Sequence, residues 1–321
     1  MTESKRRGVL PWLVAVAFFM QTLDTTILNT ALPKMASGLG ESPLRMQSVV
    51  VSYMLTVALL IPASGYLSDR FGTRRVFASA MFVFSLGSLA CALAGTLTQL
   101  VVARILQGMG GALLLPVGRL TILKAVPKAE LLSVLAFVTV PGLIGPLIGP
   151  LLGGLLVERL SWHWIFLINL PVGAVGTVAS LMYMPDLKYE ANRFDRIGFI
   201  LVGVGMISVS LGLQGIAEHA SFVGGTLVLL AVGVAALTAY WLHAEHTMDP
   251  LFHPALWSIH TYRVGLAGNL FARLGAGAMP FLTPLFLQVA LGYAPTEAGL
   301  FMGATVLGAM ASKVVVEKLV L

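Results

Sequence analysis

Long apolar stretches separated by short polar segments dominate the chain. A helix needs about 20 mostly apolar residues to cross the hydrocarbon core of a bilayer. Ten stretches reach this length: residues 9–32, 46–67, 76–95, 98–118, 131–157, 164–184, 195–214, 222–243, 262–290 and 296–312. Glycine and proline recur within them, and packed membrane helices tolerate both residues. The pattern therefore predicts an all-α, polytopic transmembrane helical bundle.

The amino-acid composition excludes two other classes of chain. Of the 321 residues, 57% are hydrophobic and 11% are charged, whereas about 25% are charged in an ordinary soluble domain. A soluble fold of this length would lack the polar side chains to cover its surface. A disordered chain needs low hydrophobicity and high charge, so disorder is excluded as well.

The distribution of basic residues predicts how the spans are oriented. If the N-terminus is cytoplasmic, the outer loops contain three basic residues: Lys34, Arg45 and Arg159. The cytoplasmic segments then contain fifteen: Lys5, Arg6, Arg7, Arg70, Arg74, Arg75, Arg119, Lys124, Lys128, Lys188, Arg193, Arg196, Arg263, Lys313 and Lys318. Cytoplasmic loops carry the excess of Lys and Arg in membrane proteins, so we expect a cytoplasmic N-terminus. The net charge of +6 then reflects topology, not nucleic-acid binding.

The start of the chain is basic and then apolar, as in a signal peptide. The apolar run is longer than the core of a signal peptide, and no small-residue cleavage site follows it closely. We therefore expect residues 9–32 to be an uncleaved first span. The longest polar connections, residues 185–196 and 244–261, are expected on the cytoplasmic surface.

Several kinds of chemical site have no signal in the sequence. Cys91 is the only cysteine, so we expect no disulfide within the chain, no cysteine-based zinc site and a buried, inert thiol. Four of the six histidines lie in or beside one loop: His243, His246, His253 and His260. Their spacing is typical of a solvated surface. No phosphate-binding Gly-x-x-x-x-Gly-Lys-Ser/Thr motif occurs. We expect no metal, no cofactor and no enzymatic activity.

Asp24 is the one acidic residue that falls well inside a predicted span. A charge inside the bilayer costs about 2.5–3.5 kcal/mol, so such a residue is a functional candidate. At 1.5 Å per residue, Asp24 lies about 12 Å below the outer end of its span, and Arg104 of the fourth span lies about 9 Å deep. Gln107 follows on the same side of the helix as Arg104. The three can meet, either around a carboxylate that exchanges a proton or in an ion pair that locks two helices.

Arg273 is a second basic residue inside a predicted span, and that span contains no carboxylate. Its partner could be cavity water, a backbone carbonyl or an anionic group of a substrate, and a structural role is the alternative. We take Arg273 and Asn29 of the first span as candidate cavity residues.

The segment after the second span carries a charged motif, Gly65-Tyr-Leu-Ser-Asp69-Arg70-Phe-Gly72-Thr-Arg74-Arg75. It resembles the signature between the second and third helices of the major facilitator superfamily. We interpret Gly65 and Gly72 as positions of close helix approach and a tight turn. Asp69 can accept bonds from helix N-terminal amides or from a basic residue on a neighbouring helix end. Thr73 departs from the family pattern, in which this position is usually basic. The resemblance implies that the charged residues of this gate motif form a cytoplasmic gate.

Further segments resemble motifs of the drug:proton antiporter branch of this superfamily, which has fourteen spans. Residues 23–33 look like its first-span motif, and residues 100–110 are similar to a fourth-span motif that the superfamily associates with proton transfer. Residues 162–171 look like the beginning of its sixth span, with His163 where the family usually has arginine. The fifth span carries the residues of the antiporter motif: Gly142, Gly145, Pro146, Gly149, Pro150, Gly153 and Gly154. Such spacing forms a flat stripe that permits close helix packing.

The resemblance implies a proton-coupled efflux transporter that exports hydrophobic or cationic small molecules across a bacterial inner membrane. The proton gradient would be the driving force, Asp24 the proton carrier, and Arg104 and Gln107 its partners. One alternative is a metabolite, amino-acid or siderophore exporter of the same fold. Another is an inactive fragment that acts only as a membrane interaction partner. The sequence does not specify the substrate, the proton stoichiometry or any self-association.

The resemblance also divides the chain. Members of this branch have two six-span halves separated by two extra spans. Residues 1–185 correspond to the first half, 186–260 to the extra spans, and 261–321 to the beginning of the second half. About ten of fourteen expected spans are present. We expect that a first half with one third of a second half cannot close a transport cavity alone.

Overall fold

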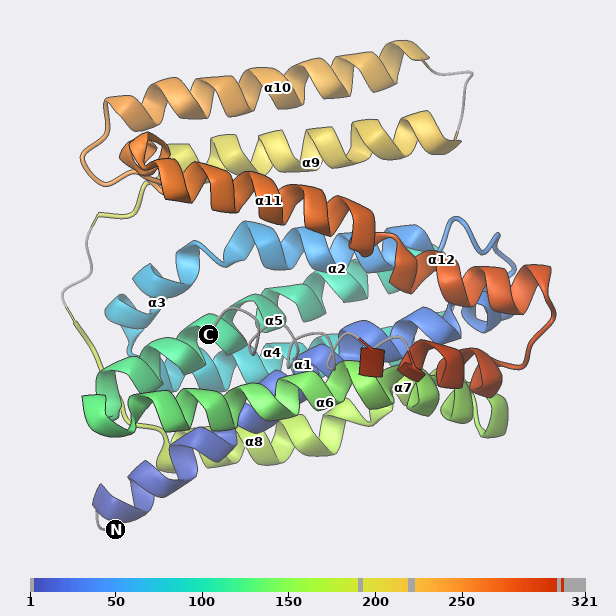
Figure 1. Cartoon of the computed structure of the whole chain (residues 1–321), viewed down its shortest axis with the longest axis horizontal. Helices are drawn as coiled ribbons and strands as arrows, with labels where there is room; N and C mark the ends of the chain where they lie inside the picture. The colour runs from blue at the N-terminus through green and yellow to red at the C-terminus, as the bar shows by residue number, and fades with distance from the viewer. Residues whose placement is uncertain (1–2, 190–192, 219–222, 305–306, 309–321) are drawn as a thin grey trace.

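The computed structural model describes residues 3–189, 193–218, 223–304 and 307–308, and every regular element in these ranges is helical (Figure 1). In chain order the elements are α1 (Glu3–Leu39), α2 (Gln47–Leu60), α3 (Ala63–Phe71), α4 (Thr73–Ala92), α5 (Leu97–Ala125), α6 (Lys128–Arg159), α7 (Trp164–Leu167), α8 (Asn169–Tyr183), α9 (Arg196–Glu218), α10 (Val223–Glu245), η2 (Pro254–Ser258), α11 (His260–Gly277), α12 (Met279–Leu285) and η3 (Phe286–Ala290). Residues 295–304 are also helical. The predicted all-α fold class is confirmed.

Most of the predicted spans correspond to helices of the structure. In the described ranges, eight helical segments are long and apolar enough to cross a membrane, and a bent pair, α2–α3, raises the number to nine if it counts as one span. The tenth predicted span, residues 296–312, begins as a helix up to residue 304 and then reaches residues outside the described ranges.

The second predicted span, residues 46–67, corresponds to two helices, α2 and α3, which are bent by 58° and together are long and apolar enough to cross a membrane. Pro62 stands at the break between them. Proline has no N–H to bond the carbonyl four residues earlier, and its ring collides with that carbonyl. The bend directs α3, which carries the first part of the gate motif, away from the axis of α2 (Figure 1).

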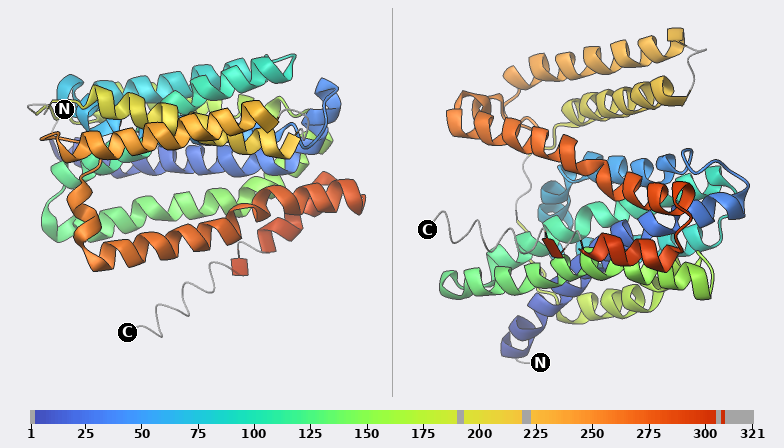
Figure 2. Two further views of the ribbon diagram at one scale, coloured as in Figure 1. Left: turned by 90° about the horizontal axis from the view of Figure 1, so that it is seen from above. Right: turned by 45° about the vertical axis from the view of Figure 1, so that its right-hand side comes forward.

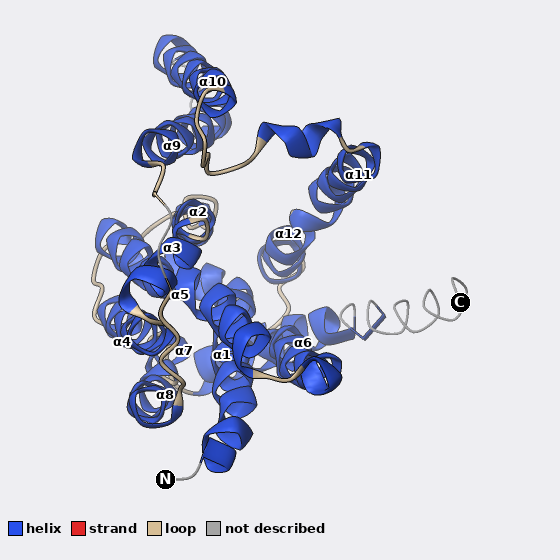
Figure 3. Cartoon of the chain, turned by 90° about the vertical axis from the view of Figure 1, so that its left-hand side faces the viewer, coloured by secondary structure: helices blue, strands red, loops and turns tan. Residues whose placement is uncertain are grey.

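Helices α1 to α8 form a bundle around two apolar clusters. α1 packs on α6, α5 on α2 and α4, and α4 on α8 (Figure 3). Met20 and Phe84 belong to the cluster nearer the beginning of α1, and Ile27 and Cys91 belong to the other. Along α1, Asp24 falls between Met20 and Ile27, so a polar layer lies between two apolar cores. Cys91 is fully buried, as predicted.

Helices α9 and α10 lie side by side and pack mainly on each other, while α9 also contacts α2 (Figures 1 and 2). They have a small apolar cluster of their own, built on Val202, Tyr240 and Ala244. The Tyr240 hydroxyl accepts a hydrogen bond from the Phe252 N–H at 2.7 Å and donates one to the Phe252 carbonyl at 3.1 Å. These bonds tie the loop after α10 to the pair. The division at residues 185/186 and 260/261 stays a prediction.

Helices α11, α12 and η3 cross back over the bundle. The described side chains of α11 are all exposed, and the helix stands apart from α9 and α10 (Figure 3). α12 packs on α1, and Gln288 of η3 donates a hydrogen bond to the Thr30 carbonyl at 2.9 Å. This region therefore contacts the bundle through α12 and η3.

Candidate functional site

Asp24 is buried in the middle of α1 and forms an ion pair with Arg104 of α5. The Arg104 Nη1 and Asp24 Oδ2 atoms are 2.7 Å apart, and both side chains are 1% exposed. The predicted proximity of these two residues, made from their depth in separate spans, is confirmed. A buried pair of this kind is strongly destabilised when one partner is removed, because the remaining charge is left without compensation.

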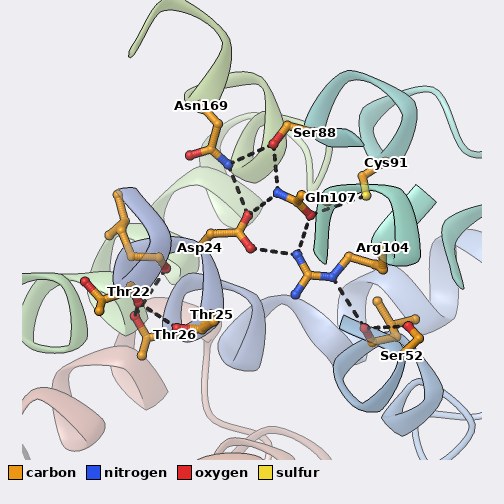
Figure 4. A network of polar contacts seen from close by, with 12 residues as sticks. Thr22, Asp24, Thr25, Thr26, Ser52, Ser88, Cys91, Arg104, Gln107 and Asn169 are labelled. Carbon is orange, nitrogen blue, oxygen red and sulfur yellow. Dashed lines mark hydrogen bonds and ion pairs between the residues drawn. The ribbon is translucent and has the colours of Figure 1, made fainter. Parts of the chain in front are cut away.

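Two amide side chains complete the surroundings of the Asp24 carboxylate (Figure 4). Gln107 Nε2 donates to Asp24 Oδ1 at 2.8 Å, and Asn169 Nδ2 donates to the same oxygen at 3.0 Å. Both amides also donate to the Ser88 hydroxyl, at 2.7 and 3.3 Å. The Gln107 carbonyl oxygen accepts from Arg104 at 2.6 Å. Side chains of α5 and α8 therefore bond the Asp24 carboxylate of α1, and Ser88 of α4 accepts from both amides.

The Arg104 guanidinium has two further partners on α2. Its Cζ atom lies 4.2 Å from the centre of the Tyr53 ring, and its Nε donates to the Val49 carbonyl at 3.4 Å. A cation over a desolvated aromatic face is stabilised by about 2 kcal/mol. The Tyr53 hydroxyl itself is buried beside the Gln21 side chain, and neither the hydroxyl nor Gln21 Oε1 makes a hydrogen bond of ordinary geometry. Arg104 would thus keep contacts with α2 and Gln107 if its bond to Asp24 opened.

Sequence reasoning missed three members of this site: Ser88, Asn169 and Tyr53. Each is a polar residue inside an apolar span, which was the signal that could have drawn attention to them. That signal is weak for serine and tyrosine, because both are common in membrane helices. Asn169 was part of the segment that resembles the beginning of the sixth span, but its contact with Asp24 depends on how α8 packs beside α4.

The gate motif lies at the end of the bundle where α1 begins. Asp69 Oδ1 accepts a bond from Lys124 Nζ, at the end of α5, at 3.0 Å. This is one of the two partners predicted for Asp69. Arg70 bonds the Tyr66 hydroxyl, Arg74 Nε donates to the Met184 carbonyl at 2.6 Å, and Arg75 is exposed.

The two motif glycines differ. Gly72 has φ = +89°, which confirms the predicted tight turn. A Cβ there would also collide with the Asp186 carboxylate. The predicted close approach at Gly65 is wrong, because a Cβ there would have no atom within 4 Å. The bend at Pro62 leaves this face of α3 open.

The glycine stripe of α6 packs against α1. The glycines that face α1 are Gly142, Gly145, Gly149 and Gly153, and a Cβ at any of them would overlap α1. The close approach lets Thr26 and Thr30 of α1 donate to the carbonyls of Gly145 and Pro150, at 3.3 and 3.1 Å. Gly154 faces the other way, against Pro295. Pro146 is half-buried within the same helix. The predicted close packing is confirmed for the four glycines that face α1, whereas Gly154 lies off that face.

The two candidate cavity residues, Asn29 and Arg273, differ in their exposure to solvent. Asn29 is 6% exposed within α1. Arg273 is exposed on α11, and its Nε donates to Asn269 Oδ1 one turn earlier, at 3.2 Å. Its hydrogen-bond partner is thus a side chain of the same helix, which was not among the partners considered from the sequence.

Among the described residues, no group of three or more His, Cys, Asp or Glu side chains is arranged to hold a metal ion. His243 of the histidine-rich loop instead contacts Asp195, with 2.8 Å between Nε2 and Oδ1.

The model of the Major Facilitator Superfamily matches residues 14–320. The chain belongs to the major facilitator superfamily. It is a multi-pass membrane protein, with the helical bundle of that superfamily. The chain is 52% identical over 312 residues to the "Putative multidrug resistance protein MdtD" of Serratia proteamaculans (strain 568), covering 96% of this chain and 65% of that protein. It is 53% identical over 309 residues to the protein of the same name from Escherichia coli O81 (strain ED1a), covering 96% and 66%. The chain therefore spans just under two thirds of the length of these curated relatives.

Solved structures of the superfamily show the same fold at low sequence identity. The peptide transporter POT in complex with sulfate matches with a TM-score of 0.62 and 16% identity, over 95% of this chain and 68% of that one. The POT family transporter PepTSo matches with a TM-score of 0.53 and 14% identity, over 72% and 52%. At such identities the likeness concerns the fold alone.

Proposed function

We propose that this chain is the larger part of a proton-coupled efflux transporter, in which Asp24 binds and releases the coupling proton. The observation that carries the proposal is the Asp24 carboxylate itself: 1% exposed, bonded by Arg104, Gln107 and Asn169, and placed between two apolar cores. Ionisable residues inside membrane helices are costly and mark proton relays and substrate pathways.

The network offers two arrangements that a proton can select. With Asp24 charged, its oxygens accept three bonds and neutralise Arg104. With Asp24 protonated, the ion pair disappears, because a neutral carboxyl group carries one O–H donor and accepts more weakly from a guanidinium. Arg104 retains the Tyr53 ring, the Val49 carbonyl and Gln107. α1 can then separate from α5 while the cation, which has lost its counter-charge, keeps these three neutral contacts.

The exported compounds would be hydrophobic or cationic small molecules. The curated relatives carry multidrug resistance in their printed name. A groove of about 520 Å³ lies between α2, α5 and α9 and is lined mainly by apolar side chains, with polar groups at Ser48, Ser52, Thr56, Ser210 and Gln214. Such a surface suits apolar compounds of varied shape. Asn29 and Arg273 remain candidates for further contacts with the substrate.

The proposed working unit follows the division of the superfamily branch that the chain resembles. Residues 1–185 would move as the first half against a second half that begins at 261, with 186–260 as extra spans. Asp69, Arg70, Arg74 and Arg75 would form the cytoplasmic gate. The membrane would be the bacterial inner membrane, with a cytoplasmic N-terminus, as the excess of Lys and Arg in alternate connections indicates.

Proton-driven uptake of a fluorescent cationic dye into inverted vesicles tests this proposal. The 321-residue chain and a version extended to the length of its curated relatives should be compared, each with Asp24→Asn. The matched control is Glu41→Gln, because Glu41 pairs with Arg45 near the protein surface, with 2.6 Å between the charged atoms.

We expect Asp24→Asn to abolish uptake and Glu41→Gln to leave it unchanged. Uptake by the extended version alone would show that further spans are needed. Uptake that persists in an active protein with Asp24→Asn would overturn the assignment of the proton carrier. An extended protein without any uptake would contradict proton-coupled export of such dyes.

A further inference from the structure

The connection between α8 and α9 runs along the gate motif. Residues 184–189, which we call the strap, follow α8 directly. The Thr73 N–H donates to the Leu187 carbonyl at 3.1 Å, and the Tyr189 N–H donates to the Asp69 carbonyl at 3.3 Å. Backbone bonds therefore hold the strap to the motif at two points, one on each side of the tight turn at Gly72.

Thr73 makes three hydrogen bonds with the strap, one through its N–H and two through its hydroxyl. Its hydroxyl donates to the Pro185 carbonyl at 2.8 Å and accepts from the Leu187 N–H at 3.1 Å. The residue is fully buried although it begins a helix at the end of the bundle, because the strap covers it. A lysine or arginine at this position could donate but could not accept. The departure of Thr73 from the family pattern thus coincides with a contact that a basic residue cannot make.

Two charged side chains, one from the motif and one from the end of α5, also contact the strap. Arg74 Nε donates to the Met184 carbonyl at 2.6 Å. Lys124, the partner of Asp69, lies over the Tyr189 ring with Nζ 3.8 Å from its centre. Lys124 therefore contacts both the motif, at Asp69, and the strap, at Tyr189. Arg74 links the motif to the strap at Met184.

We propose that the strap is a working part of the cytoplasmic gate and that Thr73 is the positioning residue that anchors it. The anchored strap fixes the arrangement of Asp69, Arg74 and Lys124, and it fixes the point from which α9 departs. The role in gating rests on the proposed function, whereas the anchoring by Thr73 is a property of the fold that can be measured without transport.

The first measurement is trypsin cleavage of the bond after Lys188 in the purified, detergent-solubilised chain. A protease needs its substrate segment released from neighbouring hydrogen bonds, so the rate reports local opening of the strap. Thr73→Val keeps the shape and the backbone N–H but loses the hydroxyl. We expect cleavage after Lys188 to become about tenfold faster, since local opening sets the rate when reclosing is fast. Thr73→Ser should cleave as the native chain does, and cleavage after the exposed Arg193 is the internal reference.

The second measurement is dye uptake by the same variants in the version extended to the length of the relatives. We expect a several-fold lower rate with Thr73→Val and recovery with Thr73→Ser. If Thr73→Val does not fold, Tyr189→Ala replaces it, because it removes the ring under Lys124 at an exposed position. The same loss of uptake is expected, and the same acceleration of cleavage once its rate is referred to cleavage of the same bond in the unfolded variant, because residue 189 is part of the cleaved bond.

Equal cleavage rates in the anchor variant and its control would overturn the anchoring. Faster cleavage with unchanged uptake would overturn the role in the gate. Faster cleavage in a protein that shows no uptake even with native Thr73 would leave the anchor standing and would instead contradict the proposed function.

Discussion

Thr26 of α1 donates its hydroxyl hydrogen to the carbonyl oxygen of Gly145 on α6, at 3.3 Å. A side chain can reach a backbone carbonyl of a neighbouring helix only where small residues let the two helices approach closely. A second bond of this kind follows about one helical turn further along both helices, where Thr30 donates to the Pro150 carbonyl at 3.1 Å. The α1–α6 contact therefore combines close packing with hydrogen bonds, and α1 carries Asp24 on a different side.

Gly145→Ala should destabilise the bundle. The new methyl group would overlap Thr22 and lie 2.9 Å from the Leu23 backbone nitrogen, which cannot move aside without shifting α1. Overpacking of this kind costs about 1–3 kcal/mol. Thermal unfolding in detergent should show a lower midpoint than for the native chain.

Gly65→Ala is the matched control for that substitution. Gly65 is also a motif glycine in a helix, but a Cβ there has no neighbour within 4 Å. Alanine is the better helix former by about 0.5–1 kcal/mol, so the midpoint should stay or rise. Equal losses for the two variants would contradict the packing seen here.

Asp24→Asn should destabilise the fold more than the double substitution Asp24→Asn/Arg104→Gln. The single change leaves the guanidinium buried without a counter-charge, at a cost of about 3–5 kcal/mol. Removing both charges relieves that cost in part. A double-mutant cycle on unfolding midpoints measures the coupling. Additive effects would show that the two charges do not depend on one another, contrary to their 2.7 Å separation.

Tyr53→Phe should leave stability unchanged or raise it slightly, whereas Tyr53→Leu should lower it. The buried Tyr53 hydroxyl makes no hydrogen bond of ordinary geometry and has the Gln21 side chain as its polar neighbour, so its removal forfeits at most a weak interaction. Leucine would remove the aromatic face that lies 4.2 Å from the Arg104 Cζ atom. Unfolding midpoints of the three proteins decide the matter. A large loss with Tyr53→Phe would mean that the hydroxyl is bonded in the membrane.

Asp195 should stabilise the loop after α10 in a pH-dependent manner. Burial raises the pKa of Asp195, but hydrogen bonds from the Gly198 N–H, His243 and the Leu251 N–H outweigh it and bring the pKa below its usual value. A carboxylate with a lowered pKa stabilises the folded state above its unfolded pKa of about 3.9, and this stabilisation disappears as the pH falls through the folded value.

The difference between the unfolding midpoints of the native chain and Asp195→Asn should therefore be largest above about pH 5, begin to shrink at about pH 4, and vanish only below the lowered pKa of Asp195. Asp249→Asn is the control, because Asp249 is exposed in the same loop. A difference that is independent of pH down to strongly acidic conditions would contradict the role assigned to the charge of Asp195.

Several features of this protein follow from the sequence alone. Apolar length fixes nine of the helical spans in the described ranges, because the hydrocarbon thickness sets one length for all of them. The similar depth of Asp24 and Arg104 in their spans was enough to predict their contact, since a buried charge needs a partner at the same depth in the membrane. The glycine spacing of α6 identified a close helix contact for the same kind of reason, as only small residues leave that space.

The tertiary structure decided which elements complete those features. Asn169 reaches Asp24, and Ser88 accepts from Asn169 and Gln107, because α8 packs on α4, and no local pattern encodes that neighbour. Gly65 and Gly72 are equivalent in a motif, but only Gly72 stands at a left-handed turn, because it joins α3 to α4, whereas Gly65 lies within α3. The strap over Thr73 joins residues more than one hundred positions apart. Such contacts depend on how whole helices pack, and a hydrophobic pattern records only that each helix has a face to bury.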